Sequence, residues 1–303
     1  MTEQMPCGMR VDCDAMTLQT RVRSSWLARA GFNARTIAKG HRGDALRHPV
    51  LMARFLATTP ELSNWTYDLQ NADELLALAA GAVGRPVAEL LAYGRELETD
   101  HQLRQALRGR LSARRDRSSE PRYGKRVILY ALVRSIKPAV VAEAGTHDGL
   151  GSVVMAAALR RNIAEGRPGR LLTFDVNADA GWLLSEQDLE VVTQHTGLTV
   201  DTLPVHLTDG VDLFIHDSLR TAENEHAEYA IARANARGEA VYLFCDNVNT
   251  TDALAELCAA LDVPLIRMKE RPARHWWPGN VLGLAQVPAT RDVTARGPFE
   301  QSR

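Results

Sequence analysis

The chain has 303 residues, of which 45% are hydrophobic and 24% are charged. This balance predicts a folded protein and excludes an intrinsically disordered one. The formal net charge of −1 gives no electrostatic reason to expect nucleic acid or an anionic membrane as a partner. No apolar run approaches the roughly 18 residues that span a bilayer, and the first residues lack the basic and apolar segments of a secretion signal. We therefore expect a cytoplasmic protein.

Four cysteines are present, at Cys7, Cys13, Cys245 and Cys258. None of them forms a Cys-x-x-Cys pair, and a chain of this size does not need disulfides to be stable. We therefore expect all four thiols to be reduced.

The first third of the chain is predicted to be helical. Apolar residues recur at helical spacing over 73–82, and the pattern repeats over 87–97 and 100–111. No strand-like alternation occurs before residue 125.

A charged connector follows at 108–126. It fits either a patch for an acidic substrate or a solvated hinge, and the hinge is favoured. We therefore predict a helical N-terminal segment over 1–118 and a second domain over 119–303.

Beyond this connector, strand-like and helix-like segments alternate, and a weaker region separates the second strand from the next. Strands in such an alternation form a mostly parallel sheet. The last two strands are joined by a short loop, which predicts an antiparallel hairpin at one edge of an α/β fold. The predicted strands are 139–143, 170–175, 211–216, 240–245, 264–268 and 281–287, and the predicted helices are 126–136, 151–163, 223–237 and 251–261, with the weak region at 180–207.

The most informative segment is the glycine-rich turn after the first strand. An acid, Glu143, is followed by Gly145, Gly149 and Gly151. Glycine lets the backbone turn tightly and approach a ligand closely. The spacing is not the Gly-x-Gly-x-x-Gly of dinucleotide enzymes, so a dehydrogenase is disfavoured. A strand–helix turn that binds no ligand is the alternative.

Polar residues stand at the carboxyl ends of the other strands, where open α/β sheets bind their ligands. Asp175 is placed to accept hydrogen bonds from ribose hydroxyls, although capping of a helix is an alternative. Asp217, Asp246 and Asn247 follow two further strands. Such hard oxygen ligands suit magnesium, unless Asp246 only caps the next helix or their proximity is a coincidence.

Two stretches carry a family resemblance. Residues 142–152 (AEAGTHDGLGS) and 211–218 (VDLFIHDS), together with Asp246-Asn247, resemble class I S-adenosylmethionine-dependent methyltransferases. More closely, they resemble the bacterial small-molecule O-methyltransferases of the catechol type and of macrolide sugar pathways, which depend on a metal. The resemblance covers about residues 125–287.

The resemblance implies a Rossmann-like fold with a seven-stranded, mostly parallel sheet and an antiparallel terminal hairpin. It implies S-adenosylmethionine as cofactor and a divalent metal, Mg²⁺, held by Asp217, Asp246 and Asn247. The helical N-terminal segment would be a substrate lid or an oligomer contact in a homo-oligomer. The implied cofactor-binding residues are Glu143, Gly145, Thr146, His147, Gly149, Gly151, Ser152, Asp175 and Asp217.

The chain departs from the family at the base. Such enzymes place a lysine or histidine three residues after the first metal-ligating aspartate, but this chain has Arg220, which keeps its proton near neutral pH. Arg220 would orient an acidic substrate or stabilise an alkoxide, or the proton would pass to His216, His147 or His275. Local packing of His216 is an alternative. A metal that lowers the pKa of the hydroxyl would also make a weak base sufficient.

Tryptophans add a further hypothesis. Trp276 and Trp277 would form an aromatic wall for a substrate, or they pack in the edge hairpin or in an oligomer contact. Trp182 would stack near the cofactor, although simple packing is favoured.

The sequence thus predicts methyl transfer from S-adenosylmethionine to a hydroxyl of a small molecule in bacterial secondary metabolism, with the acceptor chelated by a metal. The alternatives are an N-methyltransferase or other cofactor chemistry on the same fold, and a non-catalytic relative that has lost its base.

Overall fold

The computed structural model describes residues 31, 34, 46–58, 67–114, 118–275 and 277–290. The chain divides into two compact units. Unit 1 comprises 1–67, 105–122 and 272–278, and unit 2 comprises 68–104, 123–271 and 279–303. Among the described residues, no helix has the length and apolar character that crossing a membrane requires.

This division differs from the predicted boundary at residue 118. Residues 68–104 belong to the same unit as the sheet, and not to a separate helical segment. They form α5 (Ala72–Ala82) and α6 (Val87–Glu98), whose buried leucines pack against other helices of unit 2. Helical periodicity was visible in the sequence, but it does not reveal which partner covers the apolar face of a helix.

Unit 1 contains α4 (Pro49–Thr58) and the part of α7 (His101–Ser112) from residue 105 onward. Within this unit, Arg108 and Glu120 form an ion pair of 2.6 Å. The rings of Tyr67 and His275 lie with their centres 5.4 Å apart.

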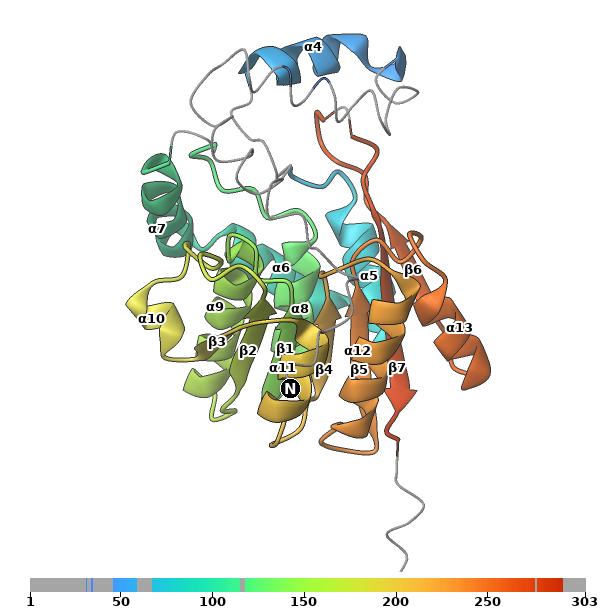
Figure 1. Ribbon diagram of the computed structural model, residues 1–303. Coiled ribbons are helices and arrows are strands. Elements are labelled where there is room, and N and C mark those ends of the chain that lie inside the picture. Colours follow the sequence, from blue (N-terminus) through green and yellow to red (C-terminus); the bar gives the residue numbers. More distant parts are fainter. Residues whose placement is uncertain are drawn as a thin grey trace, which may run out of the picture. The chain divides into compact units, whose positions relative to one another are not determined.

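Unit 2 is organised around a seven-stranded sheet in the order β3-β2-β1-β4-β5-β7-β6 (Figure 1). All neighbouring strands are parallel except β7, which runs antiparallel to both β5 and β6. The predicted α/β fold with an antiparallel terminal hairpin is therefore confirmed. The strands are β1 (Val140–Ala144), β2 (Arg170–Asp175), β3 (Val192–Thr196), β4 (Leu213–His216), β5 (Ala240–Cys245), β6 (Ile266–Lys269) and β7 (Val281–Pro288).

Helices cover both faces of this sheet (Figure 1). One layer, formed by α11, α12 and α13, packs on the apolar cluster that includes Val140, Ala142 and Ala144. The alternate residue Glu143 contacts α9, so the period-two alternation of β1 feeds both layers. The helices are α8 (Arg126–Ile136), α9 (Leu150–Ala164), α10 (Glu186–Leu189), α11 (Thr199–His206), α12 (Ala222–Ala234) and α13 (Ala253–Ala260).

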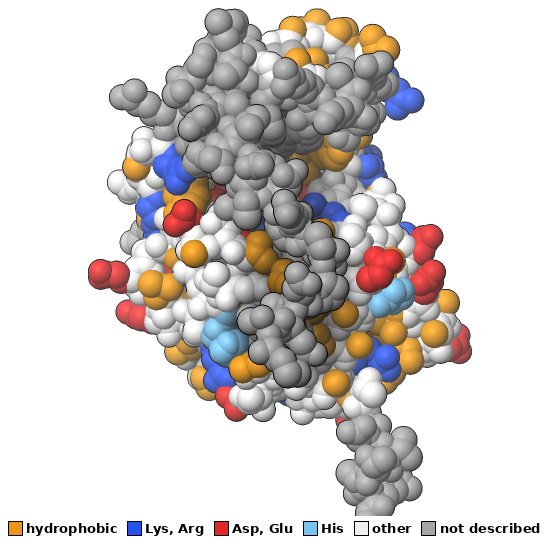
Figure 2. Space-filling model, viewed as in Figure 1, with side chains coloured by type: hydrophobic (Ala, Val, Ile, Leu, Met, Phe, Trp, Pro, Cys, Tyr) orange, Lys and Arg blue, Asp and Glu red, His pale blue; other side chains and the backbone are white. Residues whose placement is uncertain are grey.

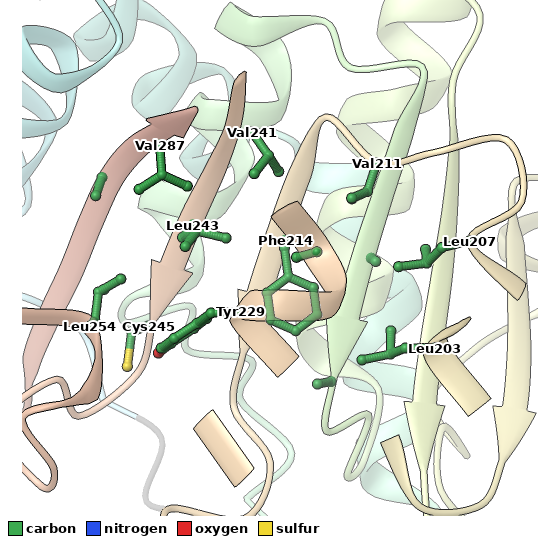
Figure 3. Close-up of a cluster of buried hydrophobic side chains, with 14 of the residues drawn as sticks. Leu203, Leu207, Val211, Phe214, Tyr229, Val241, Leu243, Cys245, Leu254 and Val287 are labelled. Carbon is green, nitrogen blue, oxygen red and sulfur yellow. The ribbon is translucent and has the colours of Figure 1, made fainter. Parts of the chain in front are cut away.

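The core between the sheet and the layer of α11, α12 and α13 is aromatic at its centre. Phe214 from β4 and Tyr229 from α12 meet edge to face with ring centres 6.4 Å apart (Figure 3). Aliphatic side chains of neighbouring strands and helices surround them. Each such buried side chain contributes about 1.5–3 kcal/mol through burial, so β4 is held firmly where its last residues enter the site.

The described face of the molecule seen in Figure 2 carries charges of both signs without a large field of either. Figure 2 shows acidic and basic side chains scattered among polar and hydrophobic ones on the visible described face. This agrees with the formal net charge of −1.

Candidate functional site

The turn between β1 and α9 is tightly packed against two neighbouring segments. Gly145 has φ +99°, and a Cβ atom there would lie 2.2 Å from the backbone oxygen of Asp217. Gly149 has φ +87°, and its Cβ would lie 2.9 Å from the Cα of Gly181. Both positions therefore require glycine, and the turn lies directly against the end of β4 and the loop after β2.

A buried polar group supports this turn from the sheet side. The Glu143 carboxylate accepts hydrogen bonds from Ser152 and from Thr173, the latter at 2.9 Å. Thr146 and Thr173 share a further hydrogen bond of 2.6 Å. Burial raises the pKa of Glu143 to about 7, although the bonds from Ser152 and Thr173 oppose the shift. These predicted cofactor contacts are thus engaged with one another inside the protein.

Gly151 contributes to the same arrangement. A Cβ atom at this position would lie 2.6 Å from Oε1 of Glu143. Gly151 therefore makes room for the buried Glu143. This packing is a structural reason for a glycine at position 151, in addition to the predicted contact with the cofactor.

Asp175, at the end of β2, reaches the glycine turn. One of its carboxylate oxygens accepts a hydrogen bond of 2.8 Å from the backbone N–H of His147, and the other accepts one of 2.9 Å from Asn177 N–H. His147 has φ +51° and an exposed side chain. Each carboxylate oxygen has a second lone pair, so Asp175 is able to accept further bonds from a ligand beside the turn.

The loop after β2 closes on the other side of the turn. Gly181 N–H donates to the backbone oxygen of His147 at 2.8 Å, and Leu183 N–H donates to that of Asp148 at 3.0 Å. Trp182 stands between these two anchored residues and is half-buried, so its predicted stacking next to a cofactor remains a prediction.

The predicted metal ligands are brought together at the ends of β4 and β5, which are neighbouring strands. Arg220 Nη2 lies 2.7 Å from an oxygen of Asp217 and 2.7 Å from an oxygen of Asp246. Asn247 has φ +62°, and its side-chain amide donates to Asp246 at 3.1 Å.

A fifth residue completes this cluster and was missed in the sequence. Lys125 Nζ lies 2.6 Å from Asp217 and 2.9 Å from Asp246. Lys125 immediately precedes α8, and its side chain is 13% exposed. The sequence offered only a lysine in a basic connector as a signal. We call Lys125, Asp217, Arg220, Asp246 and Asn247 the charged cluster.

The charged cluster is largely buried, and its two negative side chains are balanced by two positive ones. Burial acts to raise the pKa of Asp246, but Lys125 and Arg220 outweigh it and hold this pKa below its usual value. Burial and the facing Asp246 charge raise the pKa of Asp217. Burial acts to lower the pKa of Lys125, but the two carboxylates outweigh it and raise this pKa, so the ammonium keeps its proton.

A divalent metal does not fit this arrangement. The Asp246 Oδ2 atom already faces three donors, Lys125 at 2.9 Å, Arg220 at 2.7 Å and Asn247 at 3.1 Å, whereas a carboxylate oxygen has two lone pairs. Two carboxylates are matched by two cations, so a further double charge would be left without a counter-charge.

His216 is not a catalytic candidate in the structure, contrary to the prediction. It is fully buried between β4 and α12, with Nδ1 2.7 Å from Glu228 and Nε2 3.5 Å from Glu225. Burial acts to lower its pKa, but the two glutamates outweigh it and raise the pKa to about 9. A side chain with 0% exposure touches no substrate, so His216 serves the fold.

The remaining predicted residues lie in unit 1. The Nδ1 atom of His275 accepts a hydrogen bond of 3.0 Å from Trp277 N–H. Burial and the nearby Arg122 lower the pKa of His275 to about 4, so its imidazole is neutral at physiological pH. A catalytic role for His275 stays a prediction, and Trp276 lies outside the described residues.

Unit 2 also has a cavity of about 290 Å³ at the same end of α8 as Lys125. Its lining is mixed in charge, with two acids and one arginine beside an aromatic ring. The lining residues are Asp68, Leu69, Ala72, Glu98, Arg104, Tyr123, Gly124 and Val127.

Residues 142–248 match a family model described as a methyltransferase domain. The match covers about a third of the chain. The strand order and the tight glycine turn agree with the Rossmann-like fold that the sequence resemblance implies.

Solved structures give weak likenesses to this fold. An O-methyltransferase from Bacillus cereus, in complex with SAH, shares 19% identity over 62% of this chain and 91% of that one, with a TM-score of 0.46. TomG from Streptomyces achromogenes, an O-methyltransferase involved in tomaymycin synthesis and solved with SAM, shares 15% identity over 82% and 96%, with a TM-score of 0.42. Curated proteins give no match.

The span of the family match is informative about the site. The methyltransferase domain match begins within β1 and ends just after Asn247, so it includes the glycine turn, Asp175 and both aspartates of the charged cluster. Lys125 precedes it, which is why no motif of the domain pointed to this residue.

Proposed function

We propose that the protein transfers a methyl group from S-adenosylmethionine to a hydroxyl of a small molecule. The observation that carries this proposal is the contact between Asp175 and the glycine turn, in which a carboxylate with spare lone pairs accepts a hydrogen bond from the backbone N–H of His147. That pairing of an acceptor for ribose hydroxyls with a close-approach turn suits a nucleoside cofactor. The cavity of about 290 Å³ in the same unit suits a small acceptor.

The residues of the chain would act mainly by binding and alignment. When bound, S-adenosylmethionine would supply a methyl group activated on a sulfonium sulfur, and transfer would break the S–C bond, form the C–O bond and leave a neutral thioether, with the hydroxyl proton passing to solvent. The glycine turn and Asp175 hold the nucleoside side, and holding the reacting atoms in line is the main contribution expected of the protein. Arg220, whose side chain is 37% exposed, is the member of the charged cluster most available to an acceptor oxygen.

An N-methyltransferase is the second candidate, and one observation favours it. Arg220 and Lys125 are both protonated, because their pKa values are raised by the two carboxylates despite burial, and His216 is inaccessible. A nitrogen acceptor that is already neutral needs no strong base.

The predicted magnesium is not part of this proposal, because the positive and negative charges of the charged cluster already balance. Secondary metabolism, a cytoplasmic location and a homo-oligomer remain predictions.

The proposal is tested by calorimetric titration of S-adenosylmethionine into the full chain. We expect saturable binding by the wild type and about tenfold weaker binding by Asp175→Ala, which corresponds to the loss of about 1.4 kcal/mol of ribose hydrogen bonding. Asp201→Ala, an exposed acid on α11, is the matched control and leaves affinity unchanged. Absence of binding by the wild type would refute the proposal.

The class of acceptor is a separate measurement. Turnover of S-adenosylmethionine with panels of vicinal diols, simple alcohols and amines, followed as S-adenosylhomocysteine release, separates the two candidates. Methylation of amines alone would establish the second candidate in place of the first.

A further inference from the structure

We infer that Lys125 and Arg220 take the place of the divalent cation at the ends of β4 and β5, so that the transferase holds its acceptor without a metal. This inference rests on the proposed function for the identity of the reaction. Its structural basis, the charged cluster, is independent of that reaction.

The first argument is position. A cation that bridges two carboxylates must lie close to one oxygen of each. Lys125 Nζ does so, at 2.6 Å from Asp217 and 2.9 Å from Asp246. Its side chain arrives from the start of α8, whereas both acids stand at strand ends. The ammonium thus occupies the bridging point that Mg²⁺ would need, at lengths typical of charge-assisted hydrogen bonds.

The second argument is charge. Arg220 Nη2 bridges the same two carboxylates at 2.7 Å each, so two positive side chains face two negative ones. The side chains of Asp246 and Lys125 are 3% and 13% exposed, and at such depth an unbalanced charge is costly. Adding Mg²⁺ would require expulsion of both cations from their partners.

The third argument is the hydrogen-bond geometry around Asp246. Its Oδ2 atom faces three donors, and Asn280 contributes a long contact of 3.4 Å to Oδ1. Asn247 presents its amide N–H₂ to Asp246, whereas a metal would need the amide oxygen on that side. All three predicted metal ligands are therefore committed to partners within the protein.

The consequence for the acceptor follows from Arg220. Only its Nη2 atom is used by the two aspartates, and the guanidinium is partly exposed. A guanidinium carries five N–H donors in a planar fork. Its outer edge is therefore suited to donate hydrogen bonds to acceptor oxygens that would otherwise be chelated.

The test is a direct measurement of metal binding, independent of turnover. Free Mn²⁺ is followed by electron paramagnetic resonance during titration into the full-length wild type. We expect no saturable binding through millimolar Mn²⁺. Saturable binding that disappears in Asp217→Asn would overturn the inference, and this experiment needs no other variant to fold.

A second variant tests the replacement itself. In Lys125→Met the two carboxylates keep only one cation, and we expect Mn²⁺ affinity to rise by about tenfold or more, because ligand charge controls the affinity for hard cations. Lys137→Met is the matched control, since Lys137 adjoins the other end of α8 and pairs with the partly exposed Glu165 at 2.8 Å. A folded Lys125→Met protein that gains no binding over the control would also overturn the inference.

Failure of the inference and failure of the proposed function are distinguishable. The titration of S-adenosylmethionine decides the proposed function, and the Mn²⁺ titration decides the replacement. Cofactor binding with Asp217-dependent Mn²⁺ binding refutes only the replacement, whereas absent cofactor binding refutes the proposed function and leaves the metal result standing.

Discussion

Gly145 is the residue on which the site depends most directly. The backbone oxygen of Asp217 lies only 2.2 Å from the point that a Cβ atom of residue 145 would occupy, and so the missing side chain lets the glycine turn meet the end of β4. The cofactor turn and the charged cluster are thereby placed side by side. No other residue type supplies both the positive φ and the empty space.

Gly145→Ala should therefore be strongly destabilising. We expect a loss of about 2 kcal/mol or more from backbone strain and steric overlap, or about 4–8 °C in the melting temperature of a domain of this size. Thermal unfolding followed by circular dichroism measures it. Gly81→Ala in α5, where a Cβ meets nothing within 4 Å, is the control and should stabilise slightly. Equal melting temperatures for both variants would contradict the argument.

Among single residues, the sequence could predict those whose position follows directly from the strand beside them. The glycines and Asp175 follow strand ends directly, so their place at one edge of the sheet could be predicted. Lys125 could not, because it is far in sequence from both aspartates and reaches them only through the packing of α8. The burial of His216 was equally hidden, since Glu225 and Glu228 become its partners only when α12 covers β4.

At the scale of elements, α12 is joined to β4 by a buried ion pair. His216 belongs to the strand, and Glu225 and Glu228 belong to the helix. Thr199 on α11 and Ser218 also donate to Glu228. A charged histidine with two buried glutamates stabilises the interface only while the imidazole keeps its proton.

This pair makes folding stability depend on pH. The folded-state pKa of His216, about 9, lies above its ordinary value of 6.5, so its contribution is complete below pH 6.5 and is lost as the pH rises through 9. Linkage gives a fall of about 3 kcal/mol. Glu143, with its pKa raised to about 7, loses its own contribution as the pH rises from 4.5 through 7, and about half of it is still protonated at pH 7. Urea unfolding between about pH 8 and 9 therefore reports mainly on His216.

Two variants check this assignment. His216→Gln should flatten the pH dependence between about pH 8 and 9 while lowering stability at pH 7, because two buried carboxylates lose their cation. His226→Gln, an exposed histidine on α12, should leave the slope unchanged. A wild-type slope in His216→Gln would refute the assignment, and His216→Gln combined with Glu228→Gln serves if the single variant does not fold.

Element prediction failed mainly at β3. This strand (Val192–Thr196) is the edge of the sheet, and only Val192 of its five residues is buried. An edge strand needs no apolar run, so hydrophobic periodicity did not identify it within the weak region. The buried strands β1, β2 and β5 matched their predicted ranges within one residue, because burial on both faces forces continuous apolar segments.

At the scale of the whole molecule, the two units should respond differently to the cofactor. The glycine turn, Asp175 and the charged cluster all belong to unit 2. Ligand that binds only the folded state stabilises it by about 2.7 kcal/mol at a hundredfold excess over Kd. In calorimetry, S-adenosylmethionine should therefore shift the transition of unit 2, and NAD should shift none. A shift with NAD alone would favour dinucleotide chemistry.

The place of β7 in the sheet has a consequence for synthesis on the ribosome. β7 is the last of the described strands along the chain but lies between β5 and β6, and it pairs with all six residues of β5. Until residues 281–288 emerge, β5 presents an open row of backbone donors and acceptors, and such edges invite association with other chains. Nascent chains stalled between β6 and β7 should thus depend more on chaperones than chains from which β7 has emerged, because the emergence of β7 covers the open edge of β5.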